Sequence, residues 1–188
     1  VHPELERAVN LAGRCGARIT IVDSMTIAAY HAHPLPTDAA EDIVAARRRA
    51  LEYLARRVAH IPTTSRLLIG HPTTLLIEEV VRSQHDLLVR SHARDLTAGS
   101  RRHGAINEEL LEQCPCPVLL VGPGRAPEHP GIVGALSDTH DDPAQDALRS
   151  TVVDLTLLMA RLEDGAPVLL QTWVPFAEEM IRTNSPDD

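Results

Sequence analysis

The sequence predicts an α/β fold, in which a doubly wound parallel sheet is covered by helices on both faces. The first observation is that short, continuous apolar runs, typical of strands buried on both faces, recur along the chain. The second is that amphipathic stretches separate these runs at spacings that suit crossovers between parallel strands. The third is an internal repeat of one helix-to-strand unit.

The first expected helix covers residues 3–15, where apolar side chains form one helical stripe and Gly16 offers a C-terminal stop. Residues 17–24 are rich in β-branched side chains and predict a strand. Residues 25–39 contain two prolines and are expected to form a loop before a second helix at about 40–60.

The next elements repeat the alternation of strand and helix. Residues 65–70 predict a buried strand, 75–84 a helix and 86–91 another strand. After a polar segment, we expect a short helix at 106–114 and a final apolar strand at 117–122. Pro115 and Pro117 mark the start of this strand.

A proline- and glycine-rich segment, residues 123–131, is predicted to link two units, at 1–122 and 132–188. The charge balance changes at this point, because residues 1–121 hold 14 Arg and 14 acidic residues, whereas the remainder holds 4 Arg and 12 acidic residues. The elements expected in the second unit are a strand at 132–138, a helix at about 145–163 and a strand at 167–174.

The internal repeat relates the two units. LAGRCGARITIV (11–22) recurs as ARLEDGAPVLLQ (160–171), with an offset of 149 residues, which is the length of one domain. Both copies look incomplete, because the first lacks a strand before its opening helix and the second stops after its second strand. The chain therefore reads as a tandem repeat with incomplete units.

The expected sheet of the first unit has a vacant position where its first strand should lie. We expect one parallel sheet built from the strands at 17–24, 65–70, 86–91 and 117–121. The apolar strand at 132–138 either fills the vacant position or starts a second sheet, since an open position leaves unpaired backbone groups.

Composition excludes several classes of function. All 18 basic residues are Arg, so the chain has no lysine for a P-loop, a Schiff base or a protein-kinase site. Four aromatic residues are too few for a base-stacking surface, and the net charge of −8 disfavours nucleic acid as a partner.

The remaining patterns predict a cytoplasmic protein with no membrane span and no metal site. No apolar run approaches the length of a membrane helix. Cys15, Cys114 and Cys116 form no disulfide framework, and the chain lacks zinc-ligand spacing. No nucleophile elbow, Ser/His/Asp arrangement or paired-carboxylate motif indicates an enzyme, so no catalytic residue is assigned.

A cationic segment follows the strand at 86–91. Such a cluster can hold an anion through forked hydrogen bonds, and ligands of doubly wound sheets bind beyond the carboxyl ends of strands. The alternative is a solvated surface loop with no ligand. The candidate anion-binding residues are Arg90, Ser91, His92, Arg94, Arg101, Arg102 and Gly104.

Three features together resemble the universal stress protein family. They are the repeated helix–Gly–Ala–strand unit, the segment HDLLVRSHAR (85–94), and ELLEQCPCPVLLVGP (109–123) with its Pro-Cys-Pro turn. The resemblance covers about residues 3–175 and is to the tandem form, whose first domain is often degenerate. It implies the doubly wound fold and pairing of two units through the strand at 117–121, as a homodimer or within one chain.

The resemblance also locates a degenerate nucleotide loop. Nucleotide-binding members carry Gly, two residues, Gly, nine residues, Gly, then Ser or Thr. Here Arg90 and Ala93 occupy the first two glycine positions, Gly104 comes one residue late, and Ala105 replaces the hydroxyl. ATP is therefore disfavoured as a cofactor.

In the second unit, the family's acidic residue after the first strand aligns with Ser137, and Asp138 follows one residue later. These two are the candidate ligand-binding residues of that unit. The function that the resemblance implies is a non-enzymatic stress-response or binding module. The alternatives are an ATP-binding regulatory switch of the same family, and a nucleotide hydrolase or transferase of the related adenine-nucleotide α-hydrolase superfamily.

Overall fold

The computed structural model describes residues 2–26, 37–92, 98–124, 129–136 and 143–171. The chain divides into two compact units, Val1–Arg125 and Ala126–Asp188, and each is considered by itself. Among the described residues, no helix has both the length and the apolar character needed to cross a membrane.

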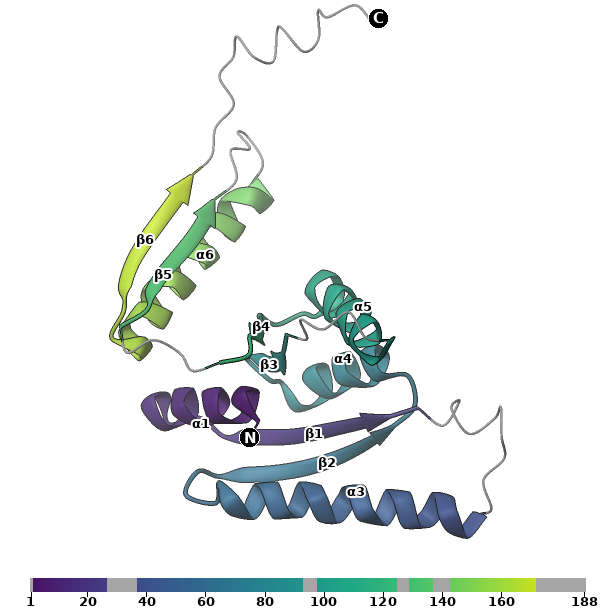
Figure 1. The fold of residues 1–188 in the computed structure, drawn as a ribbon. Helices are drawn as coiled ribbons and strands as arrows, with labels where there is room; N and C mark the ends of the chain where they lie inside the picture. Colours follow the sequence, from purple (N-terminus) through teal and green to yellow (C-terminus); the bar gives the residue numbers. More distant parts are fainter. Residues whose placement is uncertain (1, 27–36, 93–97, 125–128, 137–142, 172–188) are drawn as a thin grey trace, which may run out of the picture. The chain divides into compact units, whose positions relative to one another are not determined.

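The first unit alternates helices and strands, as the sequence predicts (Figure 1). Its elements are α1 (Pro3–Cys15), β1 (Ile19–Met25), α3 (Thr37–Arg57), β2 (Thr63–Ile69), α4 (Pro72–Ser83), β3 (Leu88–Ser91), α5 (Ala98–Gln113) and β4 (Val118–Val121).

The strands of the first unit form two separate parallel pairs. β1 pairs with β2 from Ile19 opposite Thr63 to Met25 opposite Ile69. β3 pairs with β4 from Leu88 opposite Val118 to Ser91 opposite Val121. The parallel direction is confirmed, whereas the expected single sheet with a vacant first-strand position is not: the described strands form two pairs, and no described strand is hydrogen-bonded between β1 and β3.

β1 has one unpaired edge. In a parallel strand the backbone groups of successive residues point to opposite edges. Ile19 N–H donates to Pro62 O at 2.9 Å, so the odd-numbered residues of β1 face β2. The backbone groups of Thr20, Val22 and Ser24 therefore face away from β2, where no other described strand pairs with them.

β3 has a matching unpaired edge. Leu88 N–H donates to Pro117 O at 3.0 Å, and His92 N–H donates to Val121 O at 2.7 Å. The even-numbered residues of β3 therefore face β4, whereas the backbone groups of Val89 and Ser91 face the opposite edge.

Helix α1 anchors the core of the first unit. Ala12 packs with Ile19 and Ile61 in a buried cluster. Gly16 ends the helix at φ 67°, and its N–H donates to Ala12 O, which confirms the predicted glycine stop. α1 also contacts β3 and β4, so one helix touches both strand pairs.

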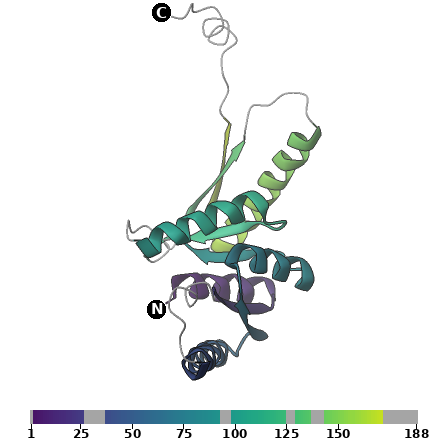
Figure 2. The ribbon, with the colours of Figure 1, turned by 90° about the vertical axis from the view of Figure 1, so that its right-hand side faces the viewer.

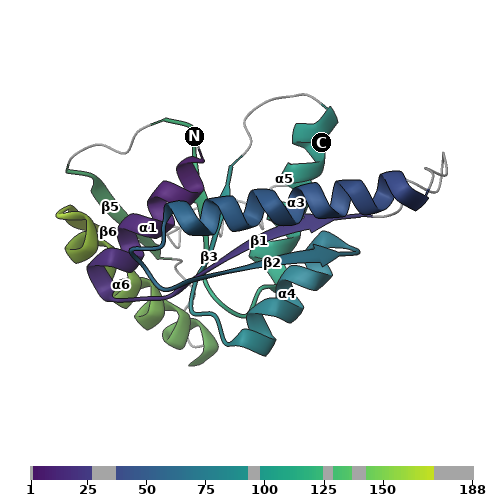
Figure 3. The same ribbon diagram turned by 90° about the horizontal axis from the view of Figure 1, so that it is seen from below.

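Helices α3 and α4 lie on opposite sides of the β1–β2 pair (Figures 1 and 3). Both contact β1 and β2, so this pair is covered on both sides, as parallel strands generally are.

The second unit is a strand–helix–strand unit, built from β5 (Gly131–Leu136), α6 (Pro143–Glu163) and β6 (Ala166–Gln171). The strands are parallel, from Gly131 opposite Ala166 to Leu136 opposite Gln171, and α6 lies along one side of them (Figure 2). Within this unit, the strand expected at 132–138 is therefore present as β5 and pairs with β6.

Gly134 allows α6 to approach β5 closely. A Cβ atom at this position would clash with Thr156 Oγ1 and lie 3.2 Å from Thr156 Cβ. The Thr156 hydroxyl is itself held, because it donates to Val152 O at 2.6 Å. The helix therefore has little freedom to move aside for a side chain.

We expect Gly134→Ala to destabilise the second unit by about 1–3 kcal/mol, because the added methyl overpacks the contact with Thr156. Urea unfolding followed by circular dichroism measures this change. Gly131→Ala is the matched control, since its Cβ would meet nothing within 4 Å. Equal unfolding midpoints for the two variants would contradict the close-packing account.

Candidate functional site

The candidate site lies where β3 ends and α5 begins. Arg90 and Ser91 are the last two residues of β3, and exposed His92 follows them. The carboxyl ends of strands are where α/β sheets bind ligands. Of the predicted anion-binding residues, the structure thus places these three at one strand end.

Helix α5 begins at Ala98 instead of the expected residue 106. Gly104 therefore lies inside the helix and not in a loop, which corrects the expected loop geometry. The segment looked polar, but it contains Ala and Arg, which are good helix formers.

The structure describes the other predicted site residues only in part or not at all. Arg101 and Arg102 lie in α5, but the structure does not describe their side chains. Arg94, Ser137 and Asp138 lie outside the described residues. These positions remain predictions from the sequence.

Arg90 carries a half-buried cation at the end of β3. Burial lowers the pKa of its guanidinium. Its Nε atom is buried and finds no hydrogen-bond partner among the described residues. Since arginine remains charged in proteins, this N–H is a charged donor available to an anion.

Asn107 is a functional candidate that the sequence reasoning missed. It is 4% exposed, and its Nδ2 donates to Ser91 O at 3.2 Å, on the unpaired edge of β3. Its Oδ1 is buried without a partner among the described residues. The sequence signal was its spacing: Asn107 lies three residues before Leu110, and residues three apart lie on the same face of a helix. Leu110 is fully buried, so this face points into the core.

Contacts between α4 and α5 hold Asn107 in place. The Thr73 hydroxyl, on the first turn of α4, donates to Glu109 Oε2 at 2.5 Å. Thr73 is 3% exposed, so this bond is shielded from water. It joins the two helices two residues beyond Asn107.

Space is open beside α5 one turn before Asn107. A Cβ atom at Gly104 would meet nothing within 4 Å. The first turn of the helix contains Gly99 and Ser100, a Gly-Ser pair that the sequence reasoning did not use. The first N–H groups of a helix have no partner within the helix and suit an anion.

A second cluster surrounds Glu79, which is 2% exposed on α4. Its carboxylate accepts a hydrogen bond from Ser83 Oγ at 2.8 Å and another from Arg82, and Arg66 Nε of β2 lies 3.2 Å away. Burial alone would raise the pKa of Glu79, but Ser83, Arg82 and Arg66 outweigh it and lower this pKa. The cluster ties α4 to β2.

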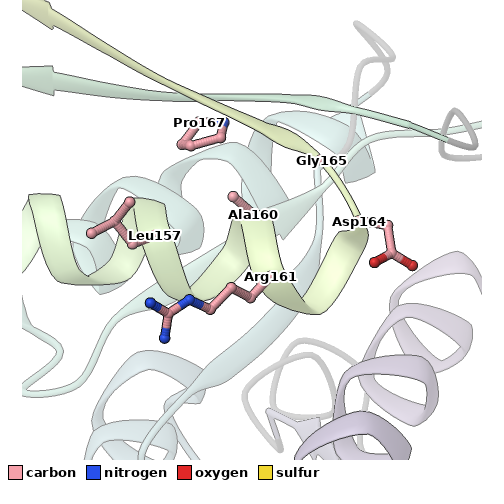
Figure 4. A pocket seen from close by; sticks show the side chains of 6 residues that line it. All are labelled: Leu157, Ala160, Arg161, Asp164, Gly165 and Pro167. Carbon is pink, nitrogen blue, oxygen red and sulfur yellow. The ribbon is translucent and has the colours of Figure 1, made fainter.

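An open depression of about 380 Å³ lies in the second unit, at the turn from α6 to β6 (Figure 4). It lies at the amino end of β6, away from the strand ends that bind ligands in this fold class. Its lining side chains bring no group of metal ligands together, and no such group exists among the described residues. The lining residues are Leu157, Ala160, Arg161, Asp164, Gly165 and Pro167.

Comparison with known proteins identifies relatives of the first unit. The family model described as the universal stress protein family matches residues 4–122. Universal stress protein E from Photorhabdus laumondii subsp. laumondii is 26% identical over 119 residues. This match covers 63% of the chain and 38% of that protein, so the chain spans well under half of this curated relative.

Solved structures share the fold. A putative universal stress protein from Pseudomonas aeruginosa UCBPP-PA14 matches with TM-score 0.59 and 17% identity, over 95% of this chain and 60% of that one. A protein of unknown function from Pseudomonas aeruginosa PAO1 matches with TM-score 0.58 and 17% identity, over 95% of this chain and 58% of that protein. A universal stress protein in complex with cAMP has TM-score 0.48 and 19% identity, over 63% of this chain and 84% of that protein.

We expect Glu79→Gln to lower the free energy of unfolding at pH 7 by about 1–3 kcal/mol, because two arginines lose their carboxylate. The folded-state pKa lies below the ordinary 4.5, so this contribution is present above about pH 4.5 and is lost as the pH falls through the folded value. Urea titrations at several pH values measure it, with exposed Glu78→Gln as the control. A difference between the variants that does not shrink at low pH would contradict this account.

Proposed function

Because this chain belongs to the universal stress protein family, we propose that it is a non-enzymatic stress-response module that binds a small anionic ligand at the carboxyl end of β3. The supporting observation is two buried polar atoms that have no hydrogen-bond partner among the described residues: Arg90 Nε, near the end of β3, and Oδ1 of Asn107, whose Nδ2 donates to Ser91 O. Buried polar groups are normally satisfied, so such atoms suit a missing ligand or water.

The two atoms define the chemistry of the ligand. Arg90 Nε offers a charged N–H, which suits a phosphate or carboxylate oxygen. Asn107 Oδ1 accepts a hydrogen bond and therefore needs a donor, such as a hydroxyl or an amine. We therefore infer a small molecule that carries both an anionic group and a hydroxyl or amine.

Tight ATP binding is not expected. The side chains of Arg90 and Ala93 stand where nucleotide-binding members have glycines that let phosphate approach the backbone. The Gly99-Ser100 pair resembles the last part of that motif, but only five residues separate it from Ala93. Two or three lost contacts amount to roughly 3–5 kcal/mol, or several hundred-fold or more in affinity.

Two alternatives remain for the same site. An ATP-binding switch requires micromolar affinity despite the changed loop, and calorimetry distinguishes it from the proposed module. A hydrolase or transferase requires turnover, which an assay with radiolabelled ATP detects.

Association of two units is a further part of the proposal. β4 pairs with β3 along one edge, and the backbone groups of Val118 and Leu120 face the other edge, where no described strand pairs with them. An apolar strand with an open edge readily takes a partner strand. The proposed partner is a second unit of the tandem type, from the same chain or from another copy.

For the anion site, we expect pyrophosphate to bind with a salt-dependent affinity that Arg90→Gln reduces about tenfold or more, because the variant loses the charged donor. Calorimetry at physiological salt measures this change, and ATP should bind at millimolar affinity or weaker. Arg48→Gln, at an exposed position of α3, is the matched control. Micromolar ATP binding, or equal effects of the two variants, would count against the proposal.

For association, we expect Leu120→Pro to raise the monomer fraction in sedimentation velocity, because proline removes the outward N–H at the edge of β4. Proline is tolerated where the N–H is not used within the sheet, so the fold should persist in circular dichroism. Leu120→Ala keeps the N–H and should associate like the original chain. A folded Leu120→Pro variant with unchanged association would refute pairing through this edge.

A further inference from the structure

A pair of cysteines lies at the opposite ends of β3 and β4 from the candidate anion site. Cys114 follows the last residue of α5, and Cys116 lies two residues before Val118, the first residue of β4. Their Sγ atoms are 3.7 Å apart, and both residues are half-buried. The sequence analysis found no disulfide framework and no zinc spacing for these cysteines, and used Cys116 only as part of the Pro-Cys-Pro turn.

From this geometry we propose that Cys114 and Cys116 form a thiol–disulfide exchange site, whose substrate is a small disulfide such as oxidised glutathione. The site is independent of the proposed anion-binding function, because it uses neither Arg90 nor Asn107.

The backbone on both sides of the pair is fixed. Cys114 N–H donates to the carbonyl of fully buried Leu110 at 2.9 Å, which continues the hydrogen bonding of α5. On the other side, Pro117 O accepts the N–H of Leu88 at 3.0 Å. Pro115 lies between the two cysteines and restricts the backbone further. The thiols are therefore held close together by the fold itself, and little chain entropy opposes ring closure.

The geometry allows a disulfide to form without a change in the course of the chain. Residues two apart have Cα atoms at most about 7 Å from each other. Disulfides accept Cα separations of about 4.4–6.8 Å. Side-chain rotation can bring the sulfurs into bonding distance. Because the ring is small, the disulfide adds little stability and should be easily reduced, as expected for an exchange site.

The order of reaction follows from the environment of the two sulfurs. Burial raises the pKa of the Cys116 thiol to about 11, and the hydrogen bond with Cys114 acts in the same direction. Cys116 therefore stays protonated at neutral pH, so Cys114 reacts first. Once Cys114 is in a mixed disulfide, its own contribution to the raised pKa is lost, and Cys116 becomes easier to ionise.

The exchange balances in two steps. The Cys114 thiolate attacks one sulfur of oxidised glutathione, forming a mixed disulfide and releasing one glutathione thiolate. Cys116 then gives its proton to solvent and attacks Cys114 Sγ, which expels the second glutathione. The two protein thiols are oxidised to one disulfide, and one oxidised glutathione is reduced to two thiols.

Cys15 provides an internal contrast. It is exposed on the last turn of α1, where its Sγ donates to Leu11 O at 3.1 Å. Oxidised glutathione should therefore leave a stable adduct on Cys15, and Cys15→Ser removes this background.

The test treats the Cys15→Ser chain with oxidised glutathione and follows thiol titration and intact mass. We expect both remaining thiols to disappear while no glutathione stays attached. Adding Cys116→Ser should instead leave glutathione on Cys114, whereas adding Cys114→Ser should leave Cys116 largely unmodified at neutral pH, because burial keeps its thiol protonated. Two unreacted thiols, or a lasting glutathione adduct on the chain that keeps both cysteines, would overturn the proposal.

A pH profile tests the role of the folded environment. Ring closure should require a higher pH in the folded Cys15→Ser chain than in the same chain in urea, where Cys116 has an ordinary pKa of roughly 8.5. This comparison needs no serine variant of the pair, so it stays decisive even where such a variant fails to fold. Identical profiles would show that the fold does not govern the reaction.

Discussion

The packing of α1 against β1 is the contact on which the rest of the first unit depends. Ala12, Ile19 and Ile61 form a buried cluster, and the same helix touches β3 and β4. Among the described residues, the two strand pairs share no hydrogen-bonded strand, and side-chain packing of α1 connects them. The bond from Thr73 to Glu109 supports this arrangement from the α4 and α5 helices. The end of β3, and with it Arg90, is therefore positioned by helices.

The unpaired edges explain why a polar side chain is buried in α5. Unpaired backbone carbonyls away from water cost free energy, and Asn107 satisfies one of them at Ser91. The same side chain keeps an acceptor that has no partner within the described part of the chain, which makes it suitable for a ligand. One residue thus serves the fold through Nδ2 and the candidate site through Oδ1.

The sequence could predict those features that depend on local pattern. The extent of α1 and its glycine stop agree with the structure, and so does the parallel direction of β1 and β2. The predicted start of α5 was wrong because a polar segment was taken for a loop. The predicted single sheet is not confirmed, because strand pairing is not a local property and the described strands form separate pairs. Asn107 was missed because its importance depends on Ser91, sixteen residues away in sequence. The two copies of the Gly-Ala repeat differ in which residue adopts the left-handed conformation. In the first copy it is Gly16, at φ 67°, whereas in the second it is Asp164, at φ 51°, and not Gly165.

Nuclear magnetic resonance of the side chains at the end of β3 tests the central claim most directly. With ¹⁵N-labelled protein titrated with pyrophosphate, the account predicts saturable shifts of the Asn107 amide and Arg90 Nε–H signals. Exposed arginines such as Arg48 should shift much less. Unchanged Asn107 and Arg90 signals, or equal shifts of every arginine, would contradict a binding site at this strand end.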